Sequence, residues 1–329
     1  MSRRPRNTAL RILIGTTLVL AVVVGALVLY TNQQLRNIPR FPLDLDRPGR
    51  PAAAAGDALN ILIAGVDDPD GSGRGPTVEK ALAGKVWPQG AFRSDAIIVL
   101  HLPADRRTAQ LVSIPRDSYV DVAGHRRTKI NAAFSYGGPQ LLARTVEDLG
   151  GIRIDHVVVV DFRGLARITD IVGGVDVYVD GSRRHLDGRE ALAYVRERHA
   201  LLRGDLDRVQ RQQNFLRALL AGLVRTGTVA NPVRLLRLTH QLASTIAVDD
   251  GLDAGTIRGL ALDSRGLRPG DLTFATVPVT GTPTIAGASV VTLDLPRTAS
   301  MLRSLGEGAL VDWLEGNHTD TLPGQRQVR

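Results

Sequence analysis

Short apolar runs alternate with longer amphipathic stretches along most of this 329-residue chain, and this alternation limits the folds that it can adopt. The runs suited to strands are Asn60–Val66, Ala96–Leu102, Gln110–Ile114, His156–Val160, Val175–Val179, Leu272–Val279 and Ser289–Leu293. The stretches suited to helices are Gly137–Leu149, Gly188–Val195, Leu206–Val224, Pro232–Ile246, Leu252–Leu262 and Pro296–Leu305. Alternating strands and helices bury their apolar faces in layers. We therefore predict an α/β fold, a layered α-β-α sandwich around a mixed central sheet.

The N-terminal apolar run predicts how the chain lies relative to a membrane. Residues Ile12–Tyr30 carry no charge and come close to the roughly 20 residues that a transmembrane helix needs. Arginines precede the run, so the positive-inside rule places residues 1–11 in the cytoplasm and the rest of the chain outside. The alternative is a cleaved signal peptide, but Tyr30–Gln34 offers no small-residue cleavage site. We predict a single-pass anchor in the cell membrane.

Composition divides the remaining chain into three parts. Residues 31–57 hold prolines, arginines and an alanine run and predict a linker. Residues 58–315 predict one extracytoplasmic domain, and the polar residues 316–329 a disordered tail. The chain has no cysteine, so packing alone must stabilise the domain. The net charge of +8 fits an acidic ligand, a membrane surface or nucleic acid, and the predicted topology excludes nucleic acid.

Charged residues lie where three consecutive predicted strands begin or end. Asp67 ends the first strand, Asp95 begins the second and Arg116 follows the third. If the strands run antiparallel in chain order, all three residues lie at one edge of the sheet. Two carboxylates there would suit Mg²⁺, which binds one or two carboxylates, waters and phosphate oxygens. Asp67 could instead be a turn residue, with Asp68 as its rival, Asp95 a strand cap, and Arg116 with Asp117 a surface pair.

Further cations and one amide predict a site for a phosphate-rich ligand. They are Arg93, Lys129, Arg196, Arg198, Arg208 and Gln212. A guanidinium binds phosphate oxygens in pairs and stays charged. Arg196 and Arg198 share a face only on an extended segment, so we predict that the preceding helix ends at Val195. Arg208 and Gln212 share a helix face.

Other residues near these motifs have open interpretations. Lys129 and Asn131 could be ordinary loop residues, and Arg211 a solvated charge. His199 could be a general base or a bystander. The sequence contains no Ser-His-Asp order, metal-binding histidine cluster or phosphate-binding glycine loop. A covalent hydrolase and a nucleoside triphosphatase therefore have no support.

The charged residues belong to six motifs that occur in a fixed order. The motifs are RSD (Arg93–Asp95), SIPRD (Ser113–Asp117), KIN (Lys129–Asn131), GGV (Gly173–Val175), LDGREALAYVRER (Leu186–Arg198) and GDLDRVQRQQ (Gly204–Gln213). In this order the chain resembles the LytR-CpsA-Psr family, from about Leu59 to Val224 and more weakly towards Asp312. One such motif alone would be weak, whereas six in order make the resemblance specific.

The resemblance implies a membrane-anchored, Mg²⁺-dependent phosphotransferase. It would move a glycopolymer phosphate, such as that of a teichoic acid, from a polyprenyl-diphosphate carrier onto peptidoglycan. By motif, the catalytic residues would be Arg116, Asp95 and Arg208. The diphosphate would be bound by Arg93, Arg116, Lys129, Arg196, Arg198, Arg208 and Gln212, and Mg²⁺ by Asp67 and Asp95. The lipid tail would enter an apolar pocket walled by the segments after Gly137 and Gly188.

The chain departs from the family pattern after Asp67. Pro69 stands where the family usually has an arginine, and a Gly-rich insertion extends to Gln89. Arg74 could replace the missing arginine. Two other functions stay open: a hydrolase that cleaves the same lipid diphosphate with water as acceptor, and a non-catalytic, membrane-anchored regulatory or binding protein.

Overall fold

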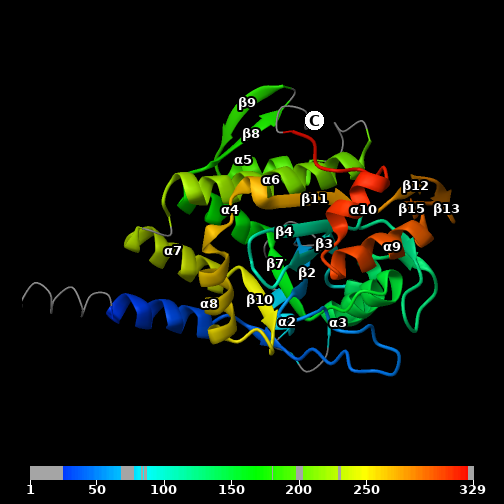
Figure 1. Cartoon of the computed structure of the whole chain (residues 1–329), viewed down its shortest axis with the longest axis horizontal. Coiled ribbons are helices and arrows are strands. Elements are labelled where there is room, and N and C mark those ends of the chain that lie inside the picture. The colour runs from blue at the N-terminus through cyan, green and yellow to red at the C-terminus, as the bar shows by residue number, and fades with distance from the viewer. Residues whose placement is uncertain are drawn as a thin grey trace, which may run out of the picture.

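The computed structural model describes residues 25–67, 78–82, 84, 87–179, 181–197, 203–228 and 231–324. Within these residues seven strands form one sheet in the spatial order β1-β10-β7-β2-β3-β4-β11 (Figure 1). Its strands are β1 (Arg40–Phe41), β2 (Leu59–Val66), β3 (Ser94–Leu102), β4 (Ala109–Ser113), β7 (His156–Asp161), β10 (Ile246–Asp249) and β11 (Leu272–Thr276). Strands β2, β3 and β4 run antiparallel in chain order, whereas β2 pairs with β7 in parallel. The mixed central sheet is confirmed.

Short hairpins and helices surround this sheet. The hairpin strands are β5 (Tyr119–Val120), β6 (Thr128–Lys129), β8 (Val175–Val179), β9 (Ser182–Leu186), β12 (Val279–Gly281), β13 (Thr284–Ile285), β14 (Ala288–Ser289) and β15 (Thr292–Leu293). The α-helices are α2 (Val78–Leu82), α3 (Asn131–Gly150), α4 (Phe162–Val172), α5 (Gly188–Arg196), α6 (Asp205–Arg225), α7 (Pro232–Ala243), α8 (Ala254–Asp263), α9 (Leu295–Gly306) and α10 (Leu310–Gly316). The predicted strand Val175–Val179 therefore exists, but it pairs with β9 outside the central sheet.

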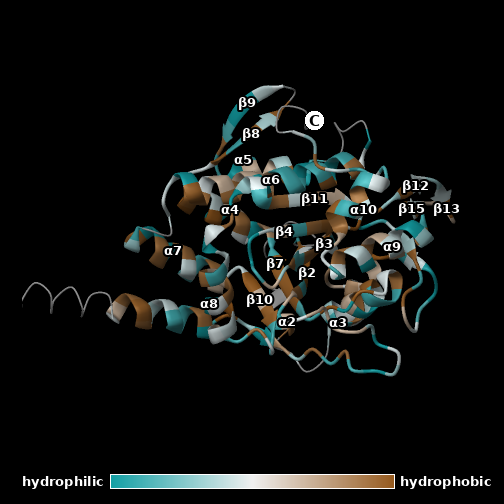
Figure 2. Cartoon of the chain, in the orientation of Figure 1, coloured by the Kyte–Doolittle hydropathy of each residue, from teal (hydrophilic) through white to brown (hydrophobic). Residues whose placement is uncertain are grey.

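Helices cover both faces of the sheet. On one face, α3 and α9 pack through side chains such as Phe134 and Met301 against Leu62 of β2, and all three are buried. On the other face, Ile98 of β3 belongs to a separate cluster that includes Leu216 of α6. Apolar residues accordingly concentrate on the sheet and on the helix faces turned towards it (Figure 2). Because each strand presents alternate side chains to opposite faces, one sheet supplies both cores.

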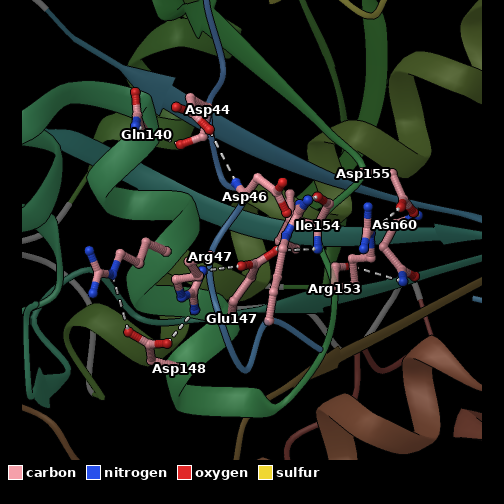
Figure 3. A network of polar contacts seen from close by, with 12 residues as sticks. Asp44, Asp46, Arg47, Asn60, Gln140, Glu147, Asp148, Arg153, Ile154 and Asp155 are labelled. Atoms are coloured by element: carbon pink, nitrogen blue, oxygen red, sulfur yellow. Dashed lines mark hydrogen bonds and ion pairs between the residues drawn. The ribbon is translucent and has the colours of Figure 1, made fainter. Parts of the chain in front are cut away.

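The domain begins before Ala58, which corrects the predicted linker over residues 31–57. Strand β1 pairs in parallel with β10 at one edge of the sheet, and Ile38, Phe41 and Leu45 around it are buried. Farther on, Arg47 and Arg50 both donate to the fully buried carboxylate of Glu147 in α3 (Figure 3). Apolar burial and these ion pairs hold residues 38–50 against the domain, which the proline-rich composition did not reveal.

The C-terminal segment also packs against the sheet. Thr321 forms an antiparallel bridge with Ala275 of β11, and the Leu322 N–H donates to the Phe274 carbonyl over 3.1 Å. The predicted disordered tail, residues 316–329, is therefore wrong for residues 317–324, while residues 325–329 lie outside the described part. The short helix α10 before it was also not predicted.

Three boundaries differ from the sequence prediction because the backbone breaks where composition does not show it. Helix α3 begins at Asn131, six residues before the predicted start at Gly137. It kinks at Gly137 and Gly138, and the backbone of Gly138, with φ +66° and ψ −157°, is not helical. The stretch predicted as one helix to Ile246 ends at Ala243, and after a two-residue turn Ile246 begins β10. The predicted late strand Leu272–Val279 divides into β11 and β12.

The predicted membrane span lies largely outside the described residues. Of Ile12–Tyr30, the structure describes residues 25–30, which are helical, and this helix extends to residue 36. Val28 and Leu29 on this helix are exposed. Within the described part of the chain, no helix is both long and apolar enough to cross a membrane. The anchor therefore stays a prediction.

Candidate active site at one end of the central sheet

Antiparallel pairing brings three of the predicted site residues to the same end of the sheet. Val66 pairs with Ser94, so Asp67 leaves β2 beside the start of β3, where Asp95 lies. The neighbouring strand β4 ends at Ser113, and Arg116 three residues later donates from Nη1 to Asp95 Oδ1. The prediction that these residues share one sheet edge is confirmed.

Arg116 is the centre of a group of charges from separate elements. Its Nε lies 3.7 Å from Asp117 Oδ2 and 3.8 Å from Asp205 Oδ1. Lys129, at the end of β6, binds the other side of Asp117, with Nζ 3.1 Å from Oδ1. The N–H of Asn131 donates to the Arg116 carbonyl over 3.1 Å. The KIN motif thus contributes one cation and one backbone contact that positions Arg116.

Helix α6 supplies the next part of the group from its first two turns. Arg208 is almost fully buried and donates from Nη2 to Asp205 Oδ1. Gln212, one turn further along, is also buried. We call Asp67, Asp95, Arg116, Asp117, Lys129, Arg196, Asp205, Arg208 and Gln212 the arginine–aspartate cluster.

Asp205 is the cluster residue that sequence reasoning missed. Two aspartates lie at the start of α6, and the motif alone does not distinguish them. In the structure Asp207 binds Arg203, with Arg203 Nε donating to Oδ1 over 2.6 Å, whereas Asp205 faces Arg116 and Arg208. The usable signal was the spacing of Asp205 three residues before Arg208, which puts both on one helix face.

Arg196 joins the cluster from α5. The helix ends at Arg196, one residue later than predicted, and Glu197 leaves it with extended ψ of 134°. A capping box of Asp187 and Glu190 fixes the other end of this helix. The Arg196 guanidinium donates from Nη2 to Asp67 Oδ1. Both predicted metal-binding carboxylates are therefore paired with an arginine.

Burial alters the acid–base properties of the cluster. Burial raises the pKa of the Asp205 carboxyl, Arg208 opposes this, and the like charges of Asp117 and Asp95 add to it. Burial also lowers the pKa of the Arg208 guanidinium. For Arg116, burial acts to lower the pKa, but the nearby carboxylates outweigh it and the pKa is raised.

Several buried polar atoms of the cluster have no hydrogen-bond partner among the described residues. They are the Nε atoms of Arg116, Arg196 and Arg208, Nε2 of Gln212, and Oδ2 of Asp205. A buried donor without a partner costs about 1–3 kcal/mol. Phosphate oxygens only accept hydrogen bonds and could therefore pair with such donors, whereas the carboxylate oxygen could accept a hydrogen bond from a hydroxyl.

The remaining predicted residues are placed less centrally or not at all. Arg93 is exposed just before β3, and no ion pair joins it to the cluster within the described residues. Arg198 and His199 lie outside the described residues, as do Asp68 and Arg74. Arg211 is not a solvated charge, because it is buried and its guanidinium lies 5.0 Å from the centre of the Tyr194 ring.

A cavity of about 860 Å³ adjoins the cluster, with Asp117 and Asp205 in its wall. The rest of the wall comes from the start of α6, from the β12–β15 region and from residues 318–320. This is not the predicted lipid pocket. The segment after Gly137 packs in the hydrophobic core with β2 and β3. The segment after Gly188 packs in a separate hydrophobic core with β8. Neither segment lines this cavity.

The donor set at the sheet end fits Mg²⁺ only together with phosphate. Within the described part of the chain, no group of three or more acidic, histidine or cysteine side chains could hold a metal ion. Asp67 and Asp95 provide two carboxylates from adjacent strands. Mg²⁺ is commonly bound by one or two carboxylates plus waters and substrate phosphates, so these residues fit it when a diphosphate is present.

Two curated relatives are similar to this chain in sequence. LcpB of Corynebacterium glutamicum, named a probable cell wall biosynthesis protein, is 35% identical over 85% of this chain and 66% of its own length. TagV of Bacillus subtilis, named a polyisoprenyl-teichoic acid–peptidoglycan teichoic acid transferase, is 37% identical over 49% of this chain and 46% of its length. This chain therefore spans about two thirds or less of these relatives.

A solved structure and a family model also match most of the chain. The crystal structure of TagV from Bacillus subtilis superposes with a TM-score of 0.59 at 25% identity, covering 77% of this chain and 97% of that one. The model of the LytR-CpsA-Psr family (LytR_cpsA_psr) matches residues 40–306, which include every described residue of the arginine–aspartate cluster. The chain belongs to the LytR-CpsA-Psr family.

Proposed function

We propose that this protein is a phosphotransferase that moves a glycopolymer phosphate from a polyprenyl-diphosphate carrier onto peptidoglycan. The observation that carries the proposal is a set of three arginines at one end of the sheet, the buried Arg208 and the partly buried Arg116 and Arg196. The Nε atom of each is buried and has no hydrogen-bond partner among the described residues. The name of the relative TagV includes both a polyisoprenyl-linked donor and peptidoglycan, which supports this choice of substrates. A teichoic acid is the polymer that this name suggests.

The arginines bind the diphosphate by exchanging partners. Each now donates to an aspartate, and phosphate oxygens would take the free Nε donors and compete for the Nη donors. Lys129 and Gln212 add one cation and one amide donor, and Arg93 and Arg198 are proposed to complete the set. Phosphoryl transfer depends mainly on such positioning and charge stabilisation.

The reaction is a displacement at the phosphorus that carries the glycan. A hydroxyl oxygen of the acceptor forms a bond to this phosphorus. The bond from the phosphorus to the bridging oxygen breaks, and polyprenyl monophosphate leaves with the electron pair. Asp205 accepts the hydroxyl proton, because its Oδ2 has no partner among the described residues and its raised pKa makes it a better base than an ordinary carboxylate.

We propose Mg²⁺ as the cofactor, held by Asp67 and Asp95. When bound, the ion would offset the charge of the diphosphate and favour departure of the phosphate. Asp95 is already fixed by Arg116, and Asp67 by Arg196. These two arginines orient the carboxylates that would bind the metal.

We also propose that residues 12–30 anchor the protein in the cell membrane with the domain outside the cytoplasm. The uncharged run and the arginines before it support this, as do the exposed Val28 and Leu29. Membrane fractions from cells should contain the intact chain. A shortened chain that begins after residue 30 and is released from the cells would instead show a cleaved signal peptide.

The function is tested with the full chain and a polyprenyl-diphosphate-linked glycan, with and without peptidoglycan. We expect covalent attachment of the glycan to peptidoglycan, with polyprenyl monophosphate as the second product. Equal release of glycan phosphate without the acceptor would indicate the hydrolase. Binding of the donor without either reaction would indicate a regulatory or binding protein, a role that matches the name of the Staphylococcus aureus relative, regulatory protein MsrR.

A further inference from the structure

The 860 Å³ cavity beside the arginine–aspartate cluster is larger than the diphosphate site needs. It shares Asp117 and Asp205 with the cluster, and then extends away from the sheet end along the β12–β15 region. Residues 318–320 form part of its wall, and the contacts of Asp320 with Arg203 and Gln210 fix them in place. A ligand there would therefore lie next to the reacting phosphorus without using the arginine donors.

The cavity wall combines apolar surface with a few fixed polar groups. Leu206, Val277, Pro278, Val279, Val290 and Val291 provide the apolar part, and Arg203, Arg297, Asp320, Thr280 and Ser289 the polar part. Several polar groups are positioned by their own contacts. For example, Arg297 donates to the His318 carbonyl over 2.7 Å. A sugar ring presents the same combination, with C–H faces and hydroxyls around the edge, and ligand pockets of this kind fix orientation with few polar groups.

The carboxylates in the wall are acceptors that suit the hydroxyls of a saccharide. Asp117, Asp205 and Asp320 bring three carboxylates to the cavity. Each is already paired with a cation, namely Lys129, Arg208 and Arg203. Paired carboxylates still accept hydrogen bonds from hydroxyls through their remaining lone pairs. Asp205 is the one that belongs to both the cavity wall and the cluster, and its Oδ2 has no hydrogen-bond partner among the described residues.

We propose that this cavity is the acceptor subsite and binds the saccharide units of the acceptor glycan. One acceptor hydroxyl lies against Asp205, and the adjoining sugars occupy the cavity between α6, the β12–β15 region and residues 318–320. This inference rests on the proposed transferase function and assigns the acceptor to a place separate from the diphosphate donors. The donor glycan, whose sugars have similar chemistry, is the competing occupant.

The test fills the cavity without altering the cluster. Ser289 is exposed and lines the cavity, whereas its neighbour Ala288, also exposed on β14, does not. Ser289→Trp should obstruct the subsite, and Ala288→Trp, which places the same side chain on the opposite face of the strand, is the matched control. The full chain is assayed for transfer at varied acceptor and varied donor. Binding of a muramidase-released disaccharide-peptide is measured separately by calorimetry.

We expect Ser289→Trp to raise the acceptor KM at least tenfold and to weaken disaccharide-peptide binding equally, with the donor KM unchanged and Ala288→Trp like wild type. A raised donor KM with an unchanged acceptor KM would overturn the assignment in favour of the donor glycan. No effect on either KM would overturn the assignment entirely, while the transferase function would stand.

The binding measurement separates the subsite from the proposed function. If wild type transfers nothing but binds the disaccharide-peptide, and Ser289→Trp weakens this binding, the subsite stands and the proposed function fails. Neither transfer nor binding would overturn both.

Discussion

Three arginines of the cluster each form an ion pair with an aspartate, namely Arg116 with Asp95, Arg196 with Asp67 and Arg208 with Asp205. Buried charges are tolerated only when they are paired, because desolvation of an unpaired ion is costly. The aspartates therefore keep the arginines in place before the substrate arrives. In the proposed reaction the diphosphate would replace the carboxylates, so its binding free energy would be the difference between two strong sets of contacts.

Replacing Arg116 or Arg208 by lysine should lower kcat/KM for transfer about tenfold to a hundredfold, because each charge-assisted hydrogen bond contributes about 1.5–3 kcal/mol. Lysine keeps the charge but cannot bind two phosphate oxygens in the same plane. Arg126→Ala is the control, since Arg126 is exposed in a turn. Rates are compared at fixed Mg²⁺ with thermal melting of each variant. Near wild-type transfer by both lysine variants would remove the arginines from the mechanism.

Asp205 should govern the acid side of the pH profile. Its raised pKa means that it stays protonated to a higher pH than an ordinary aspartate, so transfer should rise with pH as the carboxyl ionises. Asp205→Asn should abolish this rise and reduce kcat by about 10²–10⁴-fold, the usual range for a lost general base. The measurement is kcat against pH at saturating donor. An unchanged acid limb in the variant would show that another group accepts the proton.

The positions of Asp67, Asp95 and Arg116 could be predicted because antiparallel strands in chain order return to the same sheet end. The role of Asp205 could not, because it depends on which of two nearby aspartates faces Arg116 across the fold. The sequence left the position of Arg211 open for the same reason. A charged residue on a helix looks solvated in the sequence, and only the packing of α6 against α5 buries it beside Tyr194.

At the scale of elements, the β8–β9 hairpin is tied to the end of α6 by one carboxylate. Asp176 of β8 accepts from His185 and Arg183 of β9 and from Arg225 of α6. Burial acts to raise the pKa of Asp176, but these hydrogen bonds and charges lower it to about 2, from an ordinary value of 3.8. The ionised carboxylate therefore stabilises the packing of the hairpin on α6.

Asp176→Asn should destabilise the domain modestly at neutral pH, by about 0.5–1 kcal/mol, because the pair is screened by solvent. A depressed pKa contributes stability above the unfolded value of 3.8 and loses it as pH falls towards about 2. The difference in melting temperature between wild type and variant should thus disappear across this window. The exposed Asp121→Asn serves as control. A difference that persists at pH 2 would mean that the effect is not electrostatic.

Element types were largely predictable from apolar periodicity, but short strands and breaks were not. β1 has two residues and β10 has four, which is too short for a period-2 pattern to stand out. The apolar residues of α6 show a different limit. Leu206, Leu216, Leu220 and Leu223 are only half-buried, while the polar Gln213 is fully buried and donates to Ser113 and Ala275 of the sheet.

At the scale of the whole molecule, the stability of the domain depends on residues before Ala58. A version that begins at Thr31 should fold, whereas one that begins at Ala58 should melt at least 10 °C lower or fail to fold. The shorter version loses Ile38, Phe41 and Leu45, each worth about 1.5–3 kcal/mol when buried. It also leaves the buried Glu147 without Arg47 and Arg50. Circular dichroism melting compares the two, and equal midpoints would contradict the structural role of this segment.

The layered architecture followed from the alternation of strands and helices, because both faces of a sheet must be covered. The extent of the domain did not follow, because the proline-rich and polar segments at its two ends carry only isolated apolar residues. The segments that contain Ile38 and Phe41 near one end and Leu322 near the other become ordered only because β10 and β11 offer them open strand edges. Such long-range complementarity has no local signature.

The strand order also determines when a newly made chain can finish folding. Arg40 pairs with Val248 at one edge, and Thr321 bridges Ala275 at the other. Contacts between segments so distant in the chain are slow to form, because loop closure precedes any gain from pairing. Until synthesis passes β10 and then residue 321, the growing chain exposes strand edges that other chains could pair with. Strand β10 and residue 321, which come late in the domain, therefore close the strand edges through which it could aggregate.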